Sequence, residues 1–280
     1  MRDALAERGF VRARAERGFL AEAMSAPYAA AARLLGETPR FVERQTIRAT
    51  PGGRSIASSR GDAPLHTDSQ MILGVPPSVQ ILACARPAKR GGETLLVDAF
   101  GTLERLVGDD PAFAEALFDE PILQTFYFGD VEGPVASLRG GHLCVTHAPH
   151  APPGSISARF SRELWREPLH EIALREGDVL VASNHRLVHG RRAFDDASDR
   201  ELVRLLVWLD RPLDAPAALA ARALEVVDPI DAVTAARLAA VTALLRGAPP
   251  SRVAAEAGVP ESELYAWRDA FLRAGMGALG

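Results

Sequence analysis

The chain has 280 residues, 48% of them hydrophobic and 24% charged, and its formal net charge at pH 7 is -4. This length and apolar content suffice for one domain of roughly 200 to 250 residues with an appendage, while the negative charge argues against a general binder of nucleic acid or membrane surfaces. No run approaches the roughly 18 apolar residues of a membrane span, and residues 1–8 lack the apolar core of a signal peptide, so a cytoplasmic protein with no membrane partner is expected.

The N-terminal region is expected to be helical. Residues 1–40 are rich in Ala, Arg and Glu, and their apolar side chains recur at helical spacing, for example from Phe19 to Leu34. Pro27 interrupts this run, and a proline inside a helix removes a backbone hydrogen bond. We therefore expect two helices that pack against the rest of the chain.

Between residues 41 and 212 the pattern changes to short apolar or alternating runs separated by Gly and Pro, which is typical of β-strands. The clearest expected strands are 79–84, 94–97, 142–145, 178–182 and 202–209. One interruption, 103–117, predicts a helix with Thr102 as its N-cap that continues after Pro111. Many short strands with one or two helices indicate a mainly β fold, a sandwich or jelly roll rather than an alternating βαβ fold.

After Pro212 the composition changes to Ala, Leu and Arg, and the strand pattern ends. We expect one domain over residues 1–212 and a small, separate all-α unit over residues 213–280. Its helices are expected to begin near residue 214 or, in a more compact arrangement, near residue 230.

Two short segments, 64–68 and 184–191, carry the residue types of a metal site. His66 and Asp68 are two positions apart, so on a strand both side chains leave the same face. With a histidine from the second segment they would complete a 2-His-1-carboxylate set, which binds ferrous iron and leaves coordination positions open. Taken alone, an HxD triplet is common at solvent-facing strand ends, and His185 competes with His189 for the third place.

Two arginines come next along the chain. Arg200 follows the second segment, and Arg204 lies on the strand expected at 202–209. An arginine can hold a carboxylate through two parallel hydrogen bonds, so an acidic cosubstrate is expected. Arg204 has two alternatives, which are pairing with an acidic neighbour or holding the cosubstrate in place of Arg200, and Arg200 has the alternative of being a surface charge.

Four motifs follow one another in a fixed order: HxD, then Gly-Gly-Glu-Thr at 91–94, Asn-x-Arg-x-x-His-Gly-Arg at 184–191, and Asp-Arg-x-Leu-x-Arg at 199–204. In this combination residues 41–212 resemble the superfamily of taurine dioxygenase and clavaminate synthase, the Fe(II)/2-oxoglutarate-dependent oxygenases. The resemblance implies a double-stranded β-helix (jelly roll) core with packing helices. It also implies Fe(II), 2-oxoglutarate as cosubstrate, and O2.

The resemblance assigns roles to residues by their position in the motifs. The iron ligands, and hence the catalytic centre, would be His66, Asp68 and His189. The distal carboxylate of 2-oxoglutarate would be bound by Thr94 and Arg200. Arg204 matches an arginine that contacts an anionic group of the substrate in related enzymes.

The implied reaction couples decarboxylation of 2-oxoglutarate, to succinate and CO2, with oxidation of an unactivated carbon. We expect hydroxylation of an aliphatic carbon in a small carboxylate-bearing substrate, such as an amino acid or an intermediate of secondary metabolism, either free or tethered to a carrier. Desaturation and cyclisation stay open, whereas the presence of Asp68 disfavours halogenation. Homo-oligomerisation also stays open.

The remaining histidines and cysteines are expected to have no metal role. His142, His147 and His150 form a cluster in a Pro-rich segment, which favours solvated loop histidines over a second metal site. Cys84 and Cys144 lie inside apolar runs, which predicts buried thiols.

Residues 244–268 resemble the helix-turn-helix of transposase-type DNA-binding domains. The matching positions are Ala254, Gly258, Val259, Tyr265 and Trp267. Such a unit places its second helix in the major groove and contacts phosphates through Lys and Arg, but residues 234–280 hold five arginines, no lysines and four acidic residues. We therefore expect no nucleic-acid partner and a packing, dimerisation or docking role. A DNA-binding regulator that senses iron or 2-oxoglutarate is the alternative function.

Overall fold

The computed structural model describes residues 1–50, 52–53, 55–68, 74–126, 129–148, 150–195, 199–226 and 232–277. Contacts within the chain divide it into two compact units, Met1–Val226 and Val227–Gly280. Among the helices searched in these ranges, none has both the length and the apolar character that a membrane span requires.

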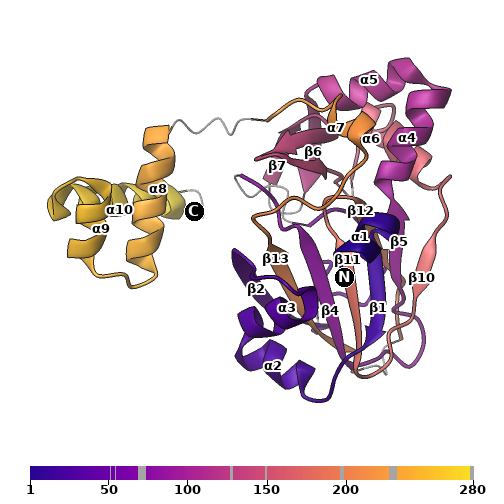
Figure 1. Cartoon of the computed structure of the whole chain (residues 1–280), viewed down its shortest axis with the longest axis horizontal. Helices are drawn as coiled ribbons and strands as arrows, with labels where there is room; N and C mark the ends of the chain where they lie inside the picture. The colour runs from indigo at the N-terminus through magenta and orange to yellow at the C-terminus, as the bar shows by residue number, and fades with distance from the viewer. Residues whose placement is uncertain are drawn as a thin grey trace. The chain divides into compact units, whose positions relative to one another are not determined.

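The first unit is built on two antiparallel sheets (Figure 1). The order in the five-stranded sheet is β1 (Phe10–Arg14), β11 (Asp178–Ser183), β4 (Val79–Arg86), β13 (Glu201–Trp208), β2 (Phe41–Arg48). The order in the four-stranded sheet is β10 (His170–Ile172), β5 (Thr94–Asp98), β12 (Leu187–Arg191), β3 (Ala63–His66). Neighbouring strands are far apart in sequence, an arrangement consistent with the expected jelly roll.

Two hairpins and several helices complete this unit. The hairpins are β6 (Ile122–Phe126) with β7 (Gly129–Gly133), and β8 (Ala136–Arg139) with β9 (His142–Val145). The helices are α1 (Arg2–Arg8), α2 (Phe19–Ser25), α3 (Pro27–Leu35), α4 (Ala99–Asp109), α5 (Pro111–Asp119), α6 (Ile156–Leu164) and α7 (Ala217–Ala220).

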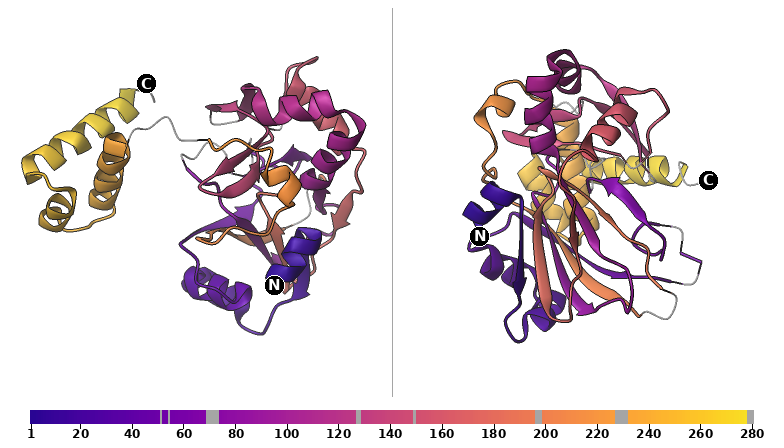
Figure 2. Two further views of the ribbon diagram at one scale, coloured as in Figure 1. Left: turned by 45° about the horizontal axis from the view of Figure 1, so that its top comes forward. Right: turned by 90° about the vertical axis from the view of Figure 1, so that its right-hand side faces the viewer.

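The side chains of β4 alternate between two cores, because successive residues of a strand point to opposite faces. Ile81 and Ala83 join a cluster with the N-terminal helices α2 and α3, which lie against the five-stranded sheet in both views of Figure 2. Leu82 and Cys84 point the other way, into a cluster that also contains Leu96 of the four-stranded sheet. The two sheets therefore pack face to face, and even-numbered residues of β4 enter the space between them.

The outer face of the four-stranded sheet is covered by helices α4 to α7. Leu95 and Val97 of β5 share a core cluster with residues of these helices, including Phe100, Phe160 and Leu219. Both sheets thus have one face against helices and one face against each other, which leaves the space between them as the place where polar side chains can be held away from solvent.

Most of the expected elements are confirmed, with one correction at a helix start. The five expected strands correspond to β4, β5, β9, β11 and β13, and Pro27 begins α3, so it does separate two helices. The N-cap at Thr102 is wrong. Asp98 caps α4, because its side chain accepts hydrogen bonds from the backbone N–H groups of Phe100 at 3.0 Å and Gly101 at 3.2 Å.

One strand was missed in the N-terminal region. β1 lies between α1 and α2 and pairs with β11, with Phe10 opposite Ala182. It is an edge strand whose residues are half-buried or exposed, so it lacks the alternating apolar pattern that identifies a strand in the sequence.

The segment after β13 remains with the first unit. Leu219 and Ala223 lie in its core, and the backbone N–H of Leu138 donates to the carbonyl of Leu224 at 2.8 Å. The division by contacts thus follows Val226, whereas the expected domain boundary follows residue 212.

The described part of the second unit holds α8 (Ala232–Leu245), α9 (Pro250–Ala257) and α10 (Glu261–Gly277). Its small core contains Ala240, Val253, Ala254 and Leu264. Gly258 ends α9 with a φ of 67°, a left-handed conformation that glycine adopts without strain.

Candidate metal centre

Three neighbouring strands bring two histidines to the same face of the four-stranded sheet. His189 on β12 lies opposite His66 on β3 and opposite Leu96 on β5. Leu96 belongs to the core between the sheets, so the two imidazoles point into that core. Their ring centroids are 4.4 Å apart, and Asp68 follows His66 just beyond the end of β3.

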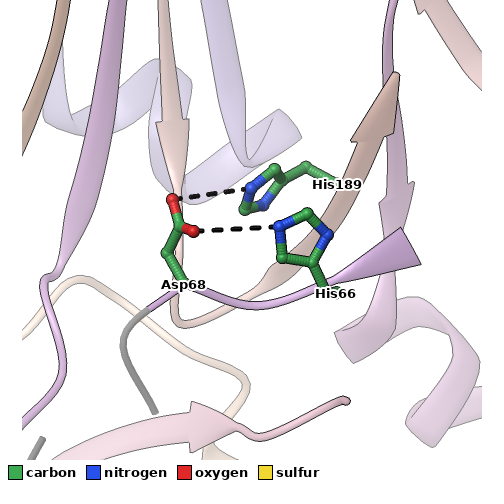
Figure 3. A group of neighbouring side chains, drawn as sticks. All are labelled: His66, Asp68 and His189. Carbon is green, nitrogen blue, oxygen red and sulfur yellow. Dashed lines mark ion pairs between the residues drawn. The ribbon is translucent and has the colours of Figure 1, made fainter. Parts of the chain in front are cut away.

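The three side chains converge on one point, as Figure 3 shows. His66 Nε2 lies 3.8 Å from Asp68 Oδ1, and His189 Nε2 lies 3.6 Å from Asp68 Oδ2. One potential ligand atom from each residue lies within 4.8 Å of the others. These separations exceed hydrogen-bond lengths but suit ligand atoms arranged around a shared metal ion. Two imidazole nitrogens with one carboxylate oxygen are a suitable ligand set for Fe(II).

The protonation states also fit a metal ligand set. Burial lowers the pKa of His66, and it lowers the pKa of His189 to about 3, so both imidazoles are neutral at neutral pH. Burial alone would raise the pKa of Asp68, but the Arg204 guanidinium and the two imidazoles hold it well below its usual range. His66 Nδ1 lies 2.8 Å from the carbonyl of Pro64, which favours a proton on Nδ1 and leaves the Nε2 lone pair directed at Asp68.

Asp68 is held by residues from distant segments of the chain. Its backbone N–H donates to Asn184 Oδ1 at 2.8 Å, and Asn184 Nδ2 donates to its carbonyl at 3.1 Å. Its carboxylate oxygen Oδ2 accepts from Gln80 Nε2 at 2.6 Å and from Arg204 Nη1 at 2.8 Å. Sequence reasoning missed Gln80. The available signal was a single amide within the otherwise apolar run of residues 79–85.

Arg204 reaches the candidate metal ligands from β13 of the five-stranded sheet. Besides its ion pair with Asp68, it donates to Gln45 Oε1 through Nη2. Its Nε atom is buried and has no hydrogen-bond partner among the described residues. Arg204 thus pairs with an acidic neighbour, which was one of the alternatives expected from the sequence. That neighbour is the candidate ligand Asp68.

Arg200 lies in a pocket between the two sheets. Its residue exposure is 7%, and the structure records neither a carboxylate within ion-pair distance nor a hydrogen-bond acceptor for it among the described residues. Burial, reinforced by the nearby Arg191, lowers its pKa to about 10. The pocket is lined by Cys84, Pro87, Ala88, Gly91, Gly92, Ala173, Leu174, Arg200 and Leu202. A buried cation without an anion at ion-pair distance carries a desolvation cost that no partner offsets. Such a cation fits a binding site for an acidic molecule.

Glycine at position 92 makes room for this arginine. A Cβ built on Gly92 would lie 3.2 Å from Arg200 Cδ and Nε, and its φ of +77° is itself unfavourable for other residues. Thr94 begins β5 two positions later, is 4% exposed, and lies opposite Arg191 in the sheet. The Gly-Gly-Glu-Thr motif thus packs against Arg200 at one end and enters the sheet at the other.

Arg191 is a second buried guanidinium that sequence reasoning used only as part of a motif. It donates to the backbone carbonyls of Ile56 at 3.0 Å, Ser59 at 2.9 Å and Gly61 at 2.6 Å. The Phe194 ring centroid lies 5.1 Å from Arg191 Cζ and 5.5 Å from Arg200 Cζ. Arg191 therefore anchors the segment that precedes β3, two positions along β12 from His189.

The other histidines lie apart from the three converging side chains. His185 Nε2 is 3.0 Å from the carbonyl of Pro76, and its ring contacts His142 at 5.3 Å. His142 and His147 are 4% and 2% exposed, so their interpretation as solvated loop residues is wrong, whereas His150 is exposed. They are buried because β9 and the residues after it pack against other strands and loops: the backbone N–H of Val145 donates to the carbonyl of His185 at 2.9 Å, and that of Thr67 donates to the carbonyl of His147 at 3.0 Å. Cys84 and Cys144 are buried free thiols, as expected.

The family model for taurine catabolism dioxygenase TauD, TfdA family, matches residues 1–206. The chain belongs to the TauD/TfdA family. The members of this family are Fe(II)/2-oxoglutarate-dependent dioxygenases, so the enzyme class and its requirements for Fe(II), 2-oxoglutarate and O2 follow from membership. The match covers both the converging His66, Asp68 and His189 and the buried Arg200.

Individual relatives agree with this membership. A uridine-5'-phosphate dioxygenase from Amycolatopsis sp is 30% identical over 203 residues, which are 64% of this chain and 74% of the relative. Among solved structures, the PvcB protein from Pseudomonas aeruginosa aligns with a TM-score of 0.52 at 17% identity, over 73% of this chain and 77% of that one. An asparagine oxygenase in complex with Fe(II), 2S,3S-3-hydroxyasparagine and succinate aligns with a TM-score of 0.50 at 18% identity, over 60% of this chain and 56% of that one. At these identities the solved structures show the shared fold.

Proposed function

We propose that this TauD/TfdA-family chain hydroxylates an aliphatic carbon of a small anionic substrate, with conversion of 2-oxoglutarate to succinate and CO2. The observation that carries the proposal is the convergence of His66, Asp68 and His189 between the two sheets, where one ligand atom from each lies within 4.8 Å of the others. We assign these three residues as the iron ligands. Bound Fe(II) would supply the reaction of dioxygen with 2-oxoglutarate.

The chain's own residues would prepare this centre. The two histidines are neutral at neutral pH because they are buried, so their nitrogens can bind a cation without first losing a proton. Asp68 is ionised and supplies one negative charge. Leu96 and Leu187 belong to the apolar cluster between the sheets, and this apolar lining would limit the access of bulk water.

Arg200 and Thr94 are proposed to bind the distal carboxylate of 2-oxoglutarate. The support is the buried guanidinium of Arg200, which has no ion-pair partner among the described residues, in a pocket that also contains Gly92. A carboxylate entering this pocket would neutralise a desolvated charge through two short hydrogen bonds. Thr94 would add a hydroxyl from the strand that starts beside the pocket.

Arg204 is proposed to contact the acidic group of the substrate. Its Nη1 and Nη2 atoms each use one N–H, for Asp68 and Gln45 respectively, and each terminal nitrogen carries a second N–H from which an acidic group of the substrate could accept a hydrogen bond. The substrate would be an amino acid or an amino-acid-derived intermediate, free or carried. A nucleoside monophosphate is a second candidate, because the 30% identical relative is named for uridine 5'-phosphate and a phosphate offers the same kind of acceptor.

We propose that helices α8, α9 and α10, in the unit that begins after Val226, form a packing, dimerisation or docking module that resembles a helix-turn-helix. The alternative of a DNA-binding regulator has no support in the comparisons, which identify the chain as a member of an enzyme family.

An anaerobic titration followed by exposure to air tests the proposed function. We expect Fe(II) with 2-oxoglutarate to produce a weak visible charge-transfer band, and air to produce succinate that increases with the correct substrate. A panel of free amino acids and nucleoside monophosphates, analysed by mass for an added oxygen, distinguishes the two substrate classes. If neither the charge-transfer band nor succinate appeared, the proposed function would be refuted.

A further inference from the structure

We infer that Gln80 is a positioning residue that, together with Arg204, directs Asp68 to bind its metal through one oxygen only. The inference rests on the proposed role of Asp68 as an iron ligand. Its basis is the pair of hydrogen bonds that converge on Asp68 Oδ2, from Gln80 Nε2 at 2.6 Å and Arg204 Nη1 at 2.8 Å.

Two donors are enough to saturate this oxygen. Each carboxylate oxygen has two in-plane lone pairs, and the ionised group accepts hydrogen bonds but does not donate them. With both lone pairs of Oδ2 engaged, Asp68 would hold a metal ion through Oδ1, which lies 3.8 Å from His66 Nε2. The same reasoning fixes the orientation of the Gln80 amide, because only its nitrogen can face an ionised carboxylate.

The position of Gln80 is fixed by the sheet rather than by a flexible loop. β4 lies in the interior of the five-stranded sheet, where Gln80 is opposite Ala182 on β11 and Leu206 on β13. The residue is 4% exposed. Its Nε2 also lies 3.4 Å from His189 Nε2, so a single amide touches two of the three candidate ligands from the sheet opposite theirs.

One-oxygen coordination matters for this type of centre. A 2-His-1-carboxylate set functions because three ligand atoms leave open positions on the metal. If Asp68 bound through both oxygens, the second oxygen would occupy a position that the 2-oxo acid or dioxygen needs. Gln80 would therefore protect the open face by holding Asp68 Oδ2.

The test replaces Gln80 with methionine, which has similar volume and no N–H donor. The matched control is Gln124→Met, since Gln124 is also a buried glutamine (1% exposed) but bonds to the backbone of Thr146 and Ala148. Two affinities are measured on the full chain: that for Co(II) without 2-oxoglutarate, from the visible absorption of the bound ion, and that for 2-oxoglutarate on the Co(II)-loaded protein.

We expect opposite changes in the two affinities of Gln80→Met. Co(II) should bind about tenfold more tightly, because Oδ2 gains a free lone pair, while 2-oxoglutarate should bind about tenfold more weakly, because it must displace that oxygen. Gln124→Met should leave both affinities as in the wild type. If Gln80→Met does not fold, the same two affinities are measured on Gln80→Asn, because the shorter asparagine side chain cannot reach Asp68.

Two results would overturn the inference. Unchanged affinities would show that Gln80 does not control the carboxylate, and a loss of both affinities would show that it only supports the local fold. A wild-type protein that binds neither Co(II) nor 2-oxoglutarate would instead refute the proposed function itself, so the two failures are distinguishable.

Discussion

Arg204 on β13 donates to Asp68 Oδ2 at 2.8 Å, although the two residues are 136 positions apart in the sequence. The pair joins the five-stranded sheet to the loop that leaves the four-stranded sheet, and both side chains are nearly buried, with exposures of 15% and 11%. An arginine expected at the substrate thus also contacts the candidate metal ligand, which makes its replacement informative.

Replacing Arg204 with methionine should impair substrate use more than cosubstrate binding. We expect kcat/KM for the substrate to fall by about 100-fold, since a charge-assisted contact is lost, while the 2-oxoglutarate concentration at half-saturation of the visible band rises by only about tenfold, because Asp68 Oδ2 also loses one of its two donors. The control is Arg44→Met on β2, an exposed arginine that bonds only to Met24 in the described structure. If the variant changes only the 2-oxoglutarate requirement, Arg204 holds the cosubstrate instead.

Replacing Arg200 with methionine should change binding and stability in opposite directions. The requirement for 2-oxoglutarate should rise by about 100-fold, because two charge-assisted hydrogen bonds are lost. The ligand-free protein should become more stable by roughly 3 kcal/mol, because burial without an ion-pair partner lowers the Arg200 pKa from 12.5 to about 10 and each pKa unit corresponds to about 1.4 kcal/mol. Urea unfolding without 2-oxoglutarate measures the second effect. A less stable variant would contradict the description of Arg200 as an uncompensated charge.

Replacing Asp68 with alanine should reduce substrate hydroxylation by more than about 100-fold, even if some iron still binds, because a ligand and a negative charge are removed from the site. The matched control is Asp62→Ala. Asp62 accepts a hydrogen bond from the backbone of Ala193 at 2.9 Å and lies outside the converging group. Product analysis by mass checks the result. Full activity in Asp68→Ala, with loss of activity in Asp62→Ala, would transfer the ligand role to Asp62.

Single alanine replacements of His189 and His185 should separate catalysis from stability. His189→Ala should abolish turnover, since it removes one of the three converging side chains. His185→Ala should retain turnover but lower the free energy of unfolding by about 1–3 kcal/mol, because a buried hydrogen bond to the carbonyl of Pro76 is lost. Succinate formation and urea unfolding measure the two effects. Loss of turnover in a folded His185→Ala protein would reverse the assignment.

The stability of the wild type should fall below neutral pH because of His185. Burial lowers its pKa from 6.5 to about 4, so between these values the unfolded chain binds a proton that the folded chain does not, and unfolding is favoured as the pH falls. The full contribution is present above about pH 6.5 and is lost progressively down to about pH 4, by up to about 3 kcal/mol. Urea unfolding at several pH values should show a shallower decline in His185→Gln. An equal decline in both proteins would contradict this role.

The sequence by itself determined the strand pattern of the jelly roll and the residue types of the site. Buried strands such as β4, β5 and β11 have continuous or alternating apolar runs, so they could be predicted from their own residues. The HxD spacing predicted that His66 and Asp68 share a face, and the arginines indicated an acidic ligand. These are local properties, because they depend on the geometry of one strand.

Only the tertiary structure decided which distant groups meet. β1 was missed because its own residues have no apolar strand pattern, and its strand conformation depends on pairing with β11. Sequence spacing left His189 and His185 equivalent, whereas the pairing of β12 with β3 places His189 opposite His66. Gln80 stands out as a lone amide in an apolar strand, but its role could not be assigned because that role depends on a carboxylate in the other half of the fold. Such contacts arise from sheet register and face-to-face packing, which join residues far apart in the chain and therefore leave no periodic trace in the sequence.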